Sequence, residues 1–342
     1  MKTTQISLAN RPNQQIRPED FALEVVELPE LSDGTILVRN TAMALTSVMA
    51  DLMRGNDLPM PPYCLGEPLW GGAVGVVEQS KSQRFVPGDI VQSMAGWRTR
   101  FVADQDTLFP VSSAQFPNPE VLLSQGPTAY HGMVNIAEVG NNDTVFITGA
   151  AGGVGSLAGQ IARKRGAQRV VGTAGSDEKV TWLVDELGFD SAFNYKNAGI
   201  EEWLGEQFPQ GFSVFFDTVG GAQFEMAIRH AGQNARFALC GTLSEQFSKD
   251  GTDQRPRFDI MTGIRKQLHI RPFSTYHTPE QIHAWTTHYA QWLADGDFSF
   301  PHTRISGGLA AGPEGLMTLM RSAHRGNVIL DLSEIIPESI AR

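Results

Sequence analysis

A glycine-rich turn between a strand pattern and a helical pattern constrains the fold of this chain most. Residues 145–148 form a short, mostly β-branched run, glycines follow at positions 149, 152, 153 and 155, and a helical pattern begins at Ser156. Glycines at such a turn let backbone N–H groups approach a pyrophosphate, which the dipole at a helix N-terminus also favours. The strict G-x-G-x-x-G spacing is absent, so a tight turn alone also fits the pattern. In its strand–turn–helix context, the segment predicts a dinucleotide site formed by Gly152, Gly153, Val154 and Gly155.

The segments around this turn predict two kinds of architecture. Between residues 121 and 300, strand candidates alternate with helical patterns, which favours a doubly wound parallel sheet. The six strand candidates are 145–148, 169–174, 191–195, 213–218, 235–240 and 268–273. Residues 1–120 instead hold short apolar runs separated by turns, typical of a small antiparallel barrel or sandwich, and short β-like segments return after residue 300. We therefore expect an α/β chain with one domain at 121–300 and a β-rich domain formed by 1–120 and 301–342.

The composition argues against several classes of partner. The 342 residues are 41% hydrophobic and carry a formal net charge of −10 without a long Lys/Arg block, unlike a binder of nucleic acid or anionic membranes. Residues 1–20 are polar and lack the apolar core of a secretory signal. The longest uncharged stretch, 145–162, contains five glycines and changes from strand-like to helical, unlike a membrane span. These features predict a cytoplasmic protein with neither a nucleic-acid nor a membrane partner.

Cysteine and histidine are arranged unlike the ligands of a metal site. The two cysteines, Cys64 and Cys240, cannot form a disulfide framework, and no ligand-spaced Cys/His cluster is present for structural zinc. Four of the eight histidines lie between residues 269 and 288, but no carboxylate or cysteine completes a ligand set with them. We therefore expect no bound metal, two packed thiols rather than nucleophiles, and a solvated helix face that carries the later histidines.

The second strand candidate, 169–174, bears on which dinucleotide is bound. A site that prefers NAD places an acidic side chain at the end of this strand, about 20 residues after the glycines, to bind the ribose 2′-hydroxyl. Here the strand ends in Thr173-Ala174-Gly175 without a carboxylate, which permits a 2′-phosphate and favours NADP. Asp177 lies slightly beyond, where we expect it to cap the next helix. Lys179 either faces solvent or supplies positive charge to the phosphate.

Short motifs along nearly the whole chain occur in the order and at the spacing of one family. They include Leu37-Val38-Arg39-Asn40, Leu65-Gly66-Glu67, Thr128-Ala129-Tyr130, Gly152-Gly153-Val154-Gly155-Ser156, Asn194-Tyr195-Lys196, Val219-Gly220-Gly221 and Cys240-Gly241. By these motifs the chain resembles the zinc-independent medium-chain dehydrogenase/reductase family. Within it, the chain is most similar to the group of leukotriene hydroxydehydrogenases, prostaglandin reductases and plant double-bond reductases.

This resemblance implies a fold, a cofactor and an activity. It implies a Rossmann domain for NADP(H), inserted between the two parts of a GroES-like catalytic domain, in a protein that is often a homodimer. The implied reaction is reduction of the carbon–carbon double bond of α,β-unsaturated ketones or aldehydes. By their positions in the motifs, Thr128 would lie beside the cofactor, and Lys179 and Tyr195 around the adenosine 2′-phosphate. Cys240 and Gly241 would face the nicotinamide ribose.

Departures from the family's pattern concern the substrate and the proton donor. The stretch 46–50 differs from the family's Asp-Pro-Tyr-Met-Arg, and Phe247 stands where relatives carry a tyrosine. Phe247 is therefore a candidate substrate-binding residue that cannot donate a proton, and we assign no catalytic residue. Water, the ribose hydroxyl of the cofactor, Tyr63 or Tyr276 would have to supply the proton.

Three hypotheses for function follow. The leading one is an NADPH-dependent ene-reductase for small enones or enals. A quinone reductase of the same superfamily is the alternative among enzymes. The altered 46–50 stretch and Phe247 also allow a non-catalytic, NADP(H)-binding regulatory protein.

Overall fold

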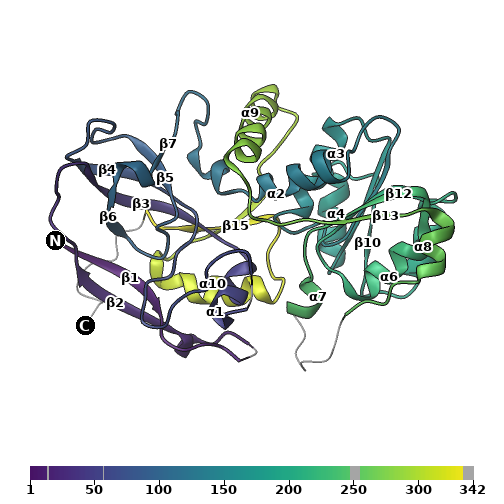
Figure 1. The fold of residues 1–342 in the computed structure, drawn as a ribbon, viewed down its shortest axis with the longest axis horizontal. Coiled ribbons are helices and arrows are strands. Elements are labelled where there is room, and N and C mark those ends of the chain that lie inside the picture. Colours follow the sequence, from purple (N-terminus) through teal and green to yellow (C-terminus); the bar gives the residue numbers. More distant parts are fainter. Residues whose placement is uncertain (14, 57, 247–254, 334–342) are drawn as a thin grey trace. The chain divides into compact units, whose positions relative to one another are not determined.

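The chain divides into two compact units, which are described separately (Figure 1). The computed structural model describes residues 1–13, 15–56, 58–246 and 255–333. One unit is the continuous segment Gln125–Pro301, which we call the parallel-sheet unit. The other comprises Met1–Ser124 and the described chain from His302 onward, and we call it the mixed-sheet unit.

Six parallel strands form the sheet of the parallel-sheet unit. Their order across the sheet is β10 (Ser191–Asn194), β9 (Arg169–Ala174), β8 (Thr144–Ile147), β11 (Phe212–Asp217), β12 (Ala231–Leu239) and β13 (His269–Pro272). Numbered along the chain this order is 3-2-1-4-5-6, typical of sheets that bind dinucleotides. The order reverses between β8 and β11, which makes the carboxyl ends of these two strands the topological switch point.

Helices connect these strands and cover the sheet. They are α2 (Gly126–Tyr130), the π-helical turn η4 (His131–Ile136), α3 (Gly155–Lys164), α4 (Asp177–Asp185), α5 (Ile200–Gln207), α6 (Gly221–His230), α7 (Leu243–Gln246), α8 (Ile260–Lys266) and α9 (Pro279–Asp295). The strands are short continuous apolar runs because both faces of a parallel sheet are buried. Phe146, Phe212, Phe215 and Phe237 pack ring against ring in this core.

The predicted α/β class is confirmed, and one strand is longer than its sequence pattern suggests. β12 begins at Ala231 instead of residue 235. Its pairing with β11 shifts register between Phe212 and Val214, and Asn234 has a φ of +59°. The polar, glycine-containing segment 232–234 therefore looks like a turn in the sequence, although it forms an irregular part of the strand.

The mixed-sheet unit is built around a seven-stranded sheet and a separate hairpin-like pair. The order across the large sheet is β14 (His302–Ile305), β15 (Asn327–Asp331), β3 (Thr35–Leu45), β4 (Ala73–Ser80), β5 (Ile90–Ser93) and β7 (Phe109–Pro110), with β6 (Arg100–Asp104) paired to β3. All pairs are antiparallel except β14 with β15. The smaller sheet pairs β1 (Lys2–Leu8) with β2 (Phe21–Glu27).

Helices of the mixed-sheet unit complete its core around Trp97, Met43 and Leu330. They are α1 (Val48–Arg54), α10 (Gly312–Met320) and the short 3₁₀ helices η1 (Pro18–Asp20), η2 (Gln105–Thr107), η3 (Pro119–Leu123) and η5 (Leu309–Ala311). The altered 46–50 stretch contains the first three residues of α1, and Gly55 caps the end of this helix in a left-handed conformation. Within the described parts of the chain, no helix is both long enough and apolar enough to cross a lipid bilayer.

Candidate functional site

The glycine turn between β8 and α3 leaves no room for side chains at two of its positions. Gly149 has a φ of +57°, and a Cβ there would lie 2.4 Å from Thr218 Oγ1. A Cβ on Gly155 would lie 2.4 Å from the carbonyl oxygen of Gly149 and 2.7 Å from Ala150 Cα. The first residue of α3 thus rests directly on the backbone of the turn, and only glycine permits this approach.

The start of α3 has hydrogen-bonding capacity that fits an anion. Val154, the residue before the helix, offers no side-chain cap to the backbone N–H groups. Ser156 Oγ is buried and has no hydrogen-bond partner among the residues that the structure describes. Gly152 is exposed, whereas Gly153 and Val154 are half-buried, so the backbone of the turn is accessible. Because helix N-termini favour negative charge, the predicted turn residues fit the pyrophosphate of a dinucleotide.

A buried polar network joins the ends of β8 and β11 at the switch point. Thr148 Oγ1 donates to Asp217 Oδ1 over 2.5 Å. The same oxygen accepts the backbone N–H groups of Val219 at 2.9 Å and Gly220 at 3.0 Å. Burial raises the pKa of the Asp217 carboxyl above its ordinary value, although these hydrogen bonds oppose the shift. The network fixes the loop after β11 where doubly wound sheets bind their ligands.

Side chains at the ends of β9 and β10 converge over one glycine. A Cβ on Gly175 would lie 3.4 Å from the Tyr195 hydroxyl oxygen and 3.6 Å from Lys196 Nζ. Tyr195 is 41% exposed, and Lys196 Nζ lies 6.0 Å from the centroid of its ring. Two hydrogen-bond donors thus stand where NAD-preferring sites carry an acid. Lys196, two residues after the end of β10, is not among the predicted site residues, although a lysine at this place is visible in the sequence.

Asp177 and Lys179, which follow β9, have different environments. The predicted capping role of Asp177 is wrong, because Ser176 is the cap and its Oγ accepts the backbone N–H of Lys179. Asp177 is already helical, and its Oδ1 accepts N–H groups from the side chains of Asn194 at 2.8 Å and Asn197 at 3.3 Å. Lys179 lies in the first turn of α4 and is half-buried.

Cys240 and Gly241 follow β12 and adjoin the loop after β11. The Cys240 N–H donates to the Asp217 carbonyl over 2.8 Å, and a Cβ on Gly241 would lie 3.2 Å from the Thr218 carbonyl oxygen. Burial, and then the nearby Asp217, raise the pKa of the Cys240 thiol to about 12, so it is no nucleophile at neutral pH. Cys64 is exposed, so the prediction of a packed thiol is wrong there, because the residue lies in the loop between α1 and β4.

Thr128 lies on α2, and its hydroxyl meets a histidine from a distant part of the chain. Its Oγ1 is 2.8 Å from His277 Nε2, in the segment between β13 and α9. Burial, and then His131, lower the pKa of His277, which keeps its imidazole neutral near pH 7. The histidines of this segment are predicted to lie on a solvated helix face, and the pair of Thr128 and His277 is not among the predictions.

The two tyrosines considered as proton donors have opposite environments. Tyr63 is 2% exposed, its hydroxyl donates to the Trp70 carbonyl over 2.7 Å, and burial raises its pKa. A hydroxyl that is already bonded and less acidic is poorly suited to protonate a substrate. Tyr276 is 68% exposed and follows β13. Phe247 falls outside the described residues, so its contact with a substrate stays a prediction.

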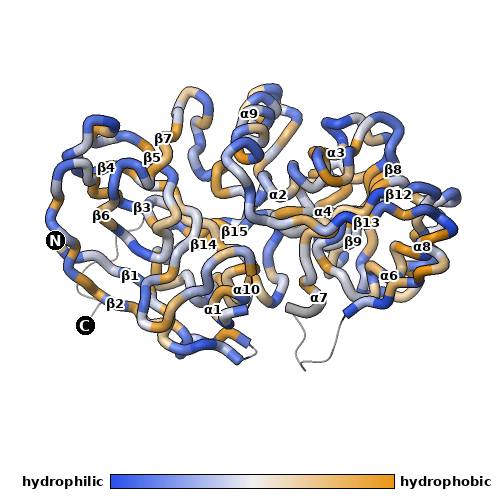
Figure 2. Tube along the Cα trace, viewed as in Figure 1, coloured by the Kyte–Doolittle hydropathy of each residue, from blue (hydrophilic) through white to orange (hydrophobic). Residues whose placement is uncertain are grey.

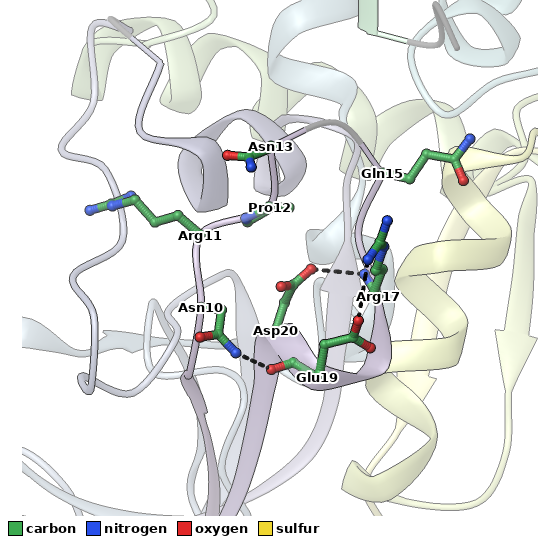
Figure 3. A pocket seen from close by; sticks show the side chains of 8 residues that line it. All are labelled: Asn10, Arg11, Pro12, Asn13, Gln15, Arg17, Glu19 and Asp20. Carbon is green, nitrogen blue, oxygen red and sulfur yellow. Dashed lines mark hydrogen bonds and ion pairs between the residues drawn. The ribbon is translucent and has the colours of Figure 1, made fainter. Parts of the chain in front are cut away.

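A polar pocket of about 770 Å³ lies in the mixed-sheet unit, lined by residues of the 10–20 segment (Figure 3). Arg17 pairs with Glu19 at 3.6 Å, and its backbone N–H donates to Asp20 Oδ2. Arg11 points away from these carboxylates (Figure 3) and donates to two backbone carbonyls. Arg17 and the carboxylates therefore hold the pocket's own segment together, whereas Arg11 ties this segment to Met53 and Tyr63.

Two family models match this chain, one in each unit. A model described as "N-terminal domain of oxidoreductase" matches residues 4–111, and one described as "Zinc-binding dehydrogenase" matches residues 153–295. In the described ranges, no three His, Cys, Asp or Glu side chains are grouped so as to hold a metal ion.

Similar proteins extend over almost the whole chain. Prostaglandin reductase 1 of Bos taurus is 34% identical over 325 residues, which cover 91% of this chain and 93% of the relative. (+)-Pulegone reductase of Mentha piperita is 30% identical and covers 96% and 98%, and NADPH-dependent curcumin reductase of Escherichia coli is 28% identical and covers 94% and 95%. The crystal structure of CurA in complex with NADPH from Vibrio vulnificus superimposes with a TM-score of 0.89 at 27% identity, over 97% of this chain and all of that one.

Proposed function

Because the chain belongs to the zinc-independent medium-chain dehydrogenase/reductase family, we propose that it reduces the carbon–carbon double bond of α,β-unsaturated ketones or aldehydes with NADPH. Relatives along the whole chain are named as reductases of prostaglandin, curcumin and pulegone. The observation that carries the cofactor assignment is the pair of donors over Gly175, which replaces the acid of an NAD site.

Each predicted cofactor residue has a role in this proposal. Gly152, Gly153, Val154 and Gly155 hold the pyrophosphate with backbone N–H groups. Tyr195, Lys196 and Lys179 bind the 2′-phosphate at the ends of β9 and β10. Cys240 and Gly241 shape the floor for the nicotinamide ribose, and Thr128 lies at the nicotinamide end. The parallel-sheet unit is thus the NADP-binding domain, and the mixed-sheet unit is the catalytic domain.

The protein orients and polarises the substrate. NADPH, when bound, supplies the hydride that adds to the β-carbon of the enone. The carbonyl oxygen then gains negative charge and needs a hydrogen-bond donor, and the α-carbon needs a proton. Tyr63 is unsuitable as the proton source because its hydroxyl is bonded to the Trp70 carbonyl. The proton therefore comes from water, the cofactor ribose hydroxyl or the exposed Tyr276.

The cofactor preference is tested by titrating the protein with NADPH and NADH. We expect NADPH to bind at least 10-fold more tightly, because charge-assisted hydrogen bonds to a phosphate are each worth about 1.5–3 kcal/mol. Replacing Lys196 by Gln is expected to weaken the binding of NADPH and to leave the binding of NADH unchanged. Tighter binding of NADH, or no binding of either, would contradict the proposal.

The substrate class is tested with a steady-state panel of small enones, enals and quinones. We expect oxidation of NADPH with the enones and enals and recovery of the saturated carbonyl product. Turnover restricted to quinones would favour the quinone reductase alternative. Tight binding of NADPH without turnover on the whole panel would instead favour a regulatory protein.

The proposal extends to a cytoplasmic homodimer. β13 is the last strand of its sheet, and its outer edge has no strand partner among the described residues. The helix before β13, α8, contains hydrophobic stretches (Figure 2). Its Ile260, Met261 and Ile264 are each more than 60% accessible. An open strand edge and exposed apolar side chains both suit a second copy of this chain. The free, exposed thiol of Cys64 suits a reducing compartment.

The oligomeric state is tested by light scattering after size-exclusion chromatography. We expect a dimer, and we expect Ile264→Glu to convert it to a monomer because the charge would be buried in the interface. The matched variant Val184→Glu, at a less exposed apolar position on α4, should leave the dimer intact. A monomeric wild-type protein would rule this part of the proposal out.

A further inference from the structure

At the carboxyl edge of the parallel sheet, the hydroxyl of Thr128 meets an imidazole that has no role in the function proposed so far. Thr128 Oγ1 and His277 Nε2 lie 2.8 Å apart, although the two residues are separated by 149 positions in the chain. Thr128 is only 9% exposed, and a buried hydroxyl is normally hydrogen-bonded. His277 supplies that bond from the segment before α9.

The pair lies on the half of the sheet opposite the residues proposed for the 2′-phosphate. η4 directly follows α2 and packs on this half: a Cβ on Gly132 would lie 2.5 Å from Phe216 of β11 and 2.6 Å from Phe273 after β13. A dinucleotide spans both halves of a doubly wound sheet from the switch point. With its adenosine end at β9 and β10, its nicotinamide end lies over β11, β12 and β13. Thr128 and His277 border that end.

Packing fixes the backbone of Thr128 independently of His277. A Cβ on Gly126 would lie 1.9 Å from Trp285 Cζ2, so the start of α2 rests directly on this indole of α9. Trp285 is 2% exposed and stacks on Tyr289 with ring centroids 4.3 Å apart. The helix is therefore held by buried aromatic contacts. The bond to His277 acts on the hydroxyl, which otherwise rotates among its staggered positions.

His277 is itself held in place. A capping box begins α9, in which Thr278 Oγ1 accepts the Gln281 N–H and Gln281 Oε1 accepts the Thr278 N–H. The amide nitrogen of Gln281 consequently faces the ring of His131, which meets the His277 ring edge-on at 5.8 Å. Nε2 of the His277 ring thus faces Thr128, while Nδ1 is buried with no hydrogen-bond partner among the described residues.

We propose that His277 is a positioning residue, which fixes the hydroxyl of Thr128 so that this hydroxyl orients the nicotinamide carboxamide of the cofactor. The inference rests on the proposed use of NADPH. A carboxamide has both a donor and an acceptor, and a hydroxyl with one preset direction selects one orientation of the ring. His277 touches neither cofactor nor substrate in this proposal and acts only through Thr128.

Binding measurements test the proposal without turnover. Dissociation constants are measured by calorimetry for NADPH and for adenosine 2′,5′-bisphosphate, which lacks the nicotinamide end. We expect His277→Ala and Thr128→Val each to weaken NADPH about 5- to 10-fold, the effect of one hydrogen bond, and to leave the bisphosphate unchanged. His283→Ala, an exposed position on α9, is the matched control and should change neither constant.

A double-mutant cycle tests whether His277 acts through Thr128. In the Thr128→Val background, His277→Ala should have no further effect on NADPH binding. His277→Gln, which keeps a hydrogen-bonding nitrogen, should restore part of the lost affinity. With NADPH deuterated on one face of the nicotinamide ring, the wild-type protein should transfer hydride from one face only, and His277→Ala should transfer measurably from both.

Three results would overturn the proposal. Equally weakened binding of NADPH and of the bisphosphate would show that His277 only stabilises the fold. Thermal unfolding would then show a matching loss of stability in the variants. Additive effects in the double mutant would show that His277 does not act through Thr128. Unchanged binding of NADPH by His277→Ala would remove the role altogether. A wild-type protein that binds neither ligand would refute the proposed function itself.

Discussion

The two halves of the parallel sheet offer different chemistry at the same edge. After β9 and β10, the side chains of Tyr195 and Lys196 reach accessible space over Gly175. In the other half, Asp217 at the end of β11 accepts a hydrogen bond inside the protein from Thr148, which lies across the switch point. The first half is suited to select a charged ligand, because its donors are accessible. The second half is suited to hold backbone and side chains in one geometry, because its polar groups are buried and bonded to each other.

The glycine turn is where the two halves are joined, and Gly155→Ala should affect it most. A new Cβ would meet two backbone atoms of the turn, which cannot move aside as a side chain can. We expect a loss of about 2–3 kcal/mol in the free energy of unfolding, typical of severe overpacking, and a fall in NADPH affinity of tens of fold. Calorimetric titration and urea unfolding measure the two effects. Gly140→Ala, where a Cβ has open space, should leave both unchanged.

An acid introduced in the first half should break its preference for phosphate. Gly175→Asp places a carboxylate near Lys196 Nζ, where the Cβ makes ordinary contacts with its neighbours. The carboxylate would neutralise the ammonium group and repel a 2′-phosphate. We expect NADPH to bind about 10- to 30-fold more weakly and NADH to bind more tightly, consistent with 1–2 kcal/mol for a partly exposed charge. Gly175→Asn is the neutral control, and an equal effect of both variants would argue against a charge-based preference.

In the second half, Asp217 should make the free energy of unfolding depend on pH. Burial raises the pKa of its carboxyl in the folded state, so protonation stabilises the fold at low pH. That contribution is complete below the pKa of the unfolded chain and is lost as the pH rises through the folded pKa. Asn at this position cannot ionise. As the pH rises, the free energy of unfolding of the wild type should therefore fall relative to that of Asp217→Asn. The expected fall is about 1.4 kcal/mol for each unit by which the pKa is raised.

Urea unfolding of the wild type and Asp217→Asn between pH 4 and pH 8 measures this difference. A constant difference across that range would show that the carboxyl titrates alike in the folded and unfolded states. The contrast between the two halves would then lose its electrostatic basis.

The smallest expected effect concerns the reactivity of the two thiols in the wild-type protein. With the pKa of Cys240 raised to about 12, only about one in ten thousand of its thiols is ionised at pH 8. An aromatic disulfide reagent should therefore modify the exposed Cys64 first and the half-buried Cys240 much more slowly. Peptide mapping after brief labelling identifies the modified residue. Equal labelling of both thiols would contradict the raised pKa of Cys240.

Much of the fold follows from local pattern. The apolar runs of β8, β9 and β11 stand between clear turns, and their predicted ends lie within one residue of those observed. Such runs are readable because a buried parallel strand is apolar throughout. The start of β12 is missed because its first residues are polar and irregular. The identity of the cap of α4 is missed because Ser176 and Asp177 are both good caps, and only backbone geometry separates them.

The site is predictable only where its residues are neighbours in sequence. The turn 149–155 is one continuous segment, so its shape is evident from its glycines. The pair of Thr128 and His277 is not, because two helices must pack before the side chains meet. The exposure of Cys64 likewise depends on the path of a loop, which apolar pattern does not specify. Contacts that depend on tertiary packing are thus the part that the sequence leaves open.

The pairing of β15 with β3 has a consequence for the order in which the protein is made. β3 is synthesised early, but β15, which pairs with its second half, belongs to the last described part of the chain. The whole of Gln125–Pro301 leaves the ribosome in between. Since domains fold as units during synthesis, the parallel sheet forms while β3 still has an unfilled edge. The mixed sheet is completed last. A chain truncated before residue 327 would therefore keep the parallel sheet but lack β15 of the mixed sheet.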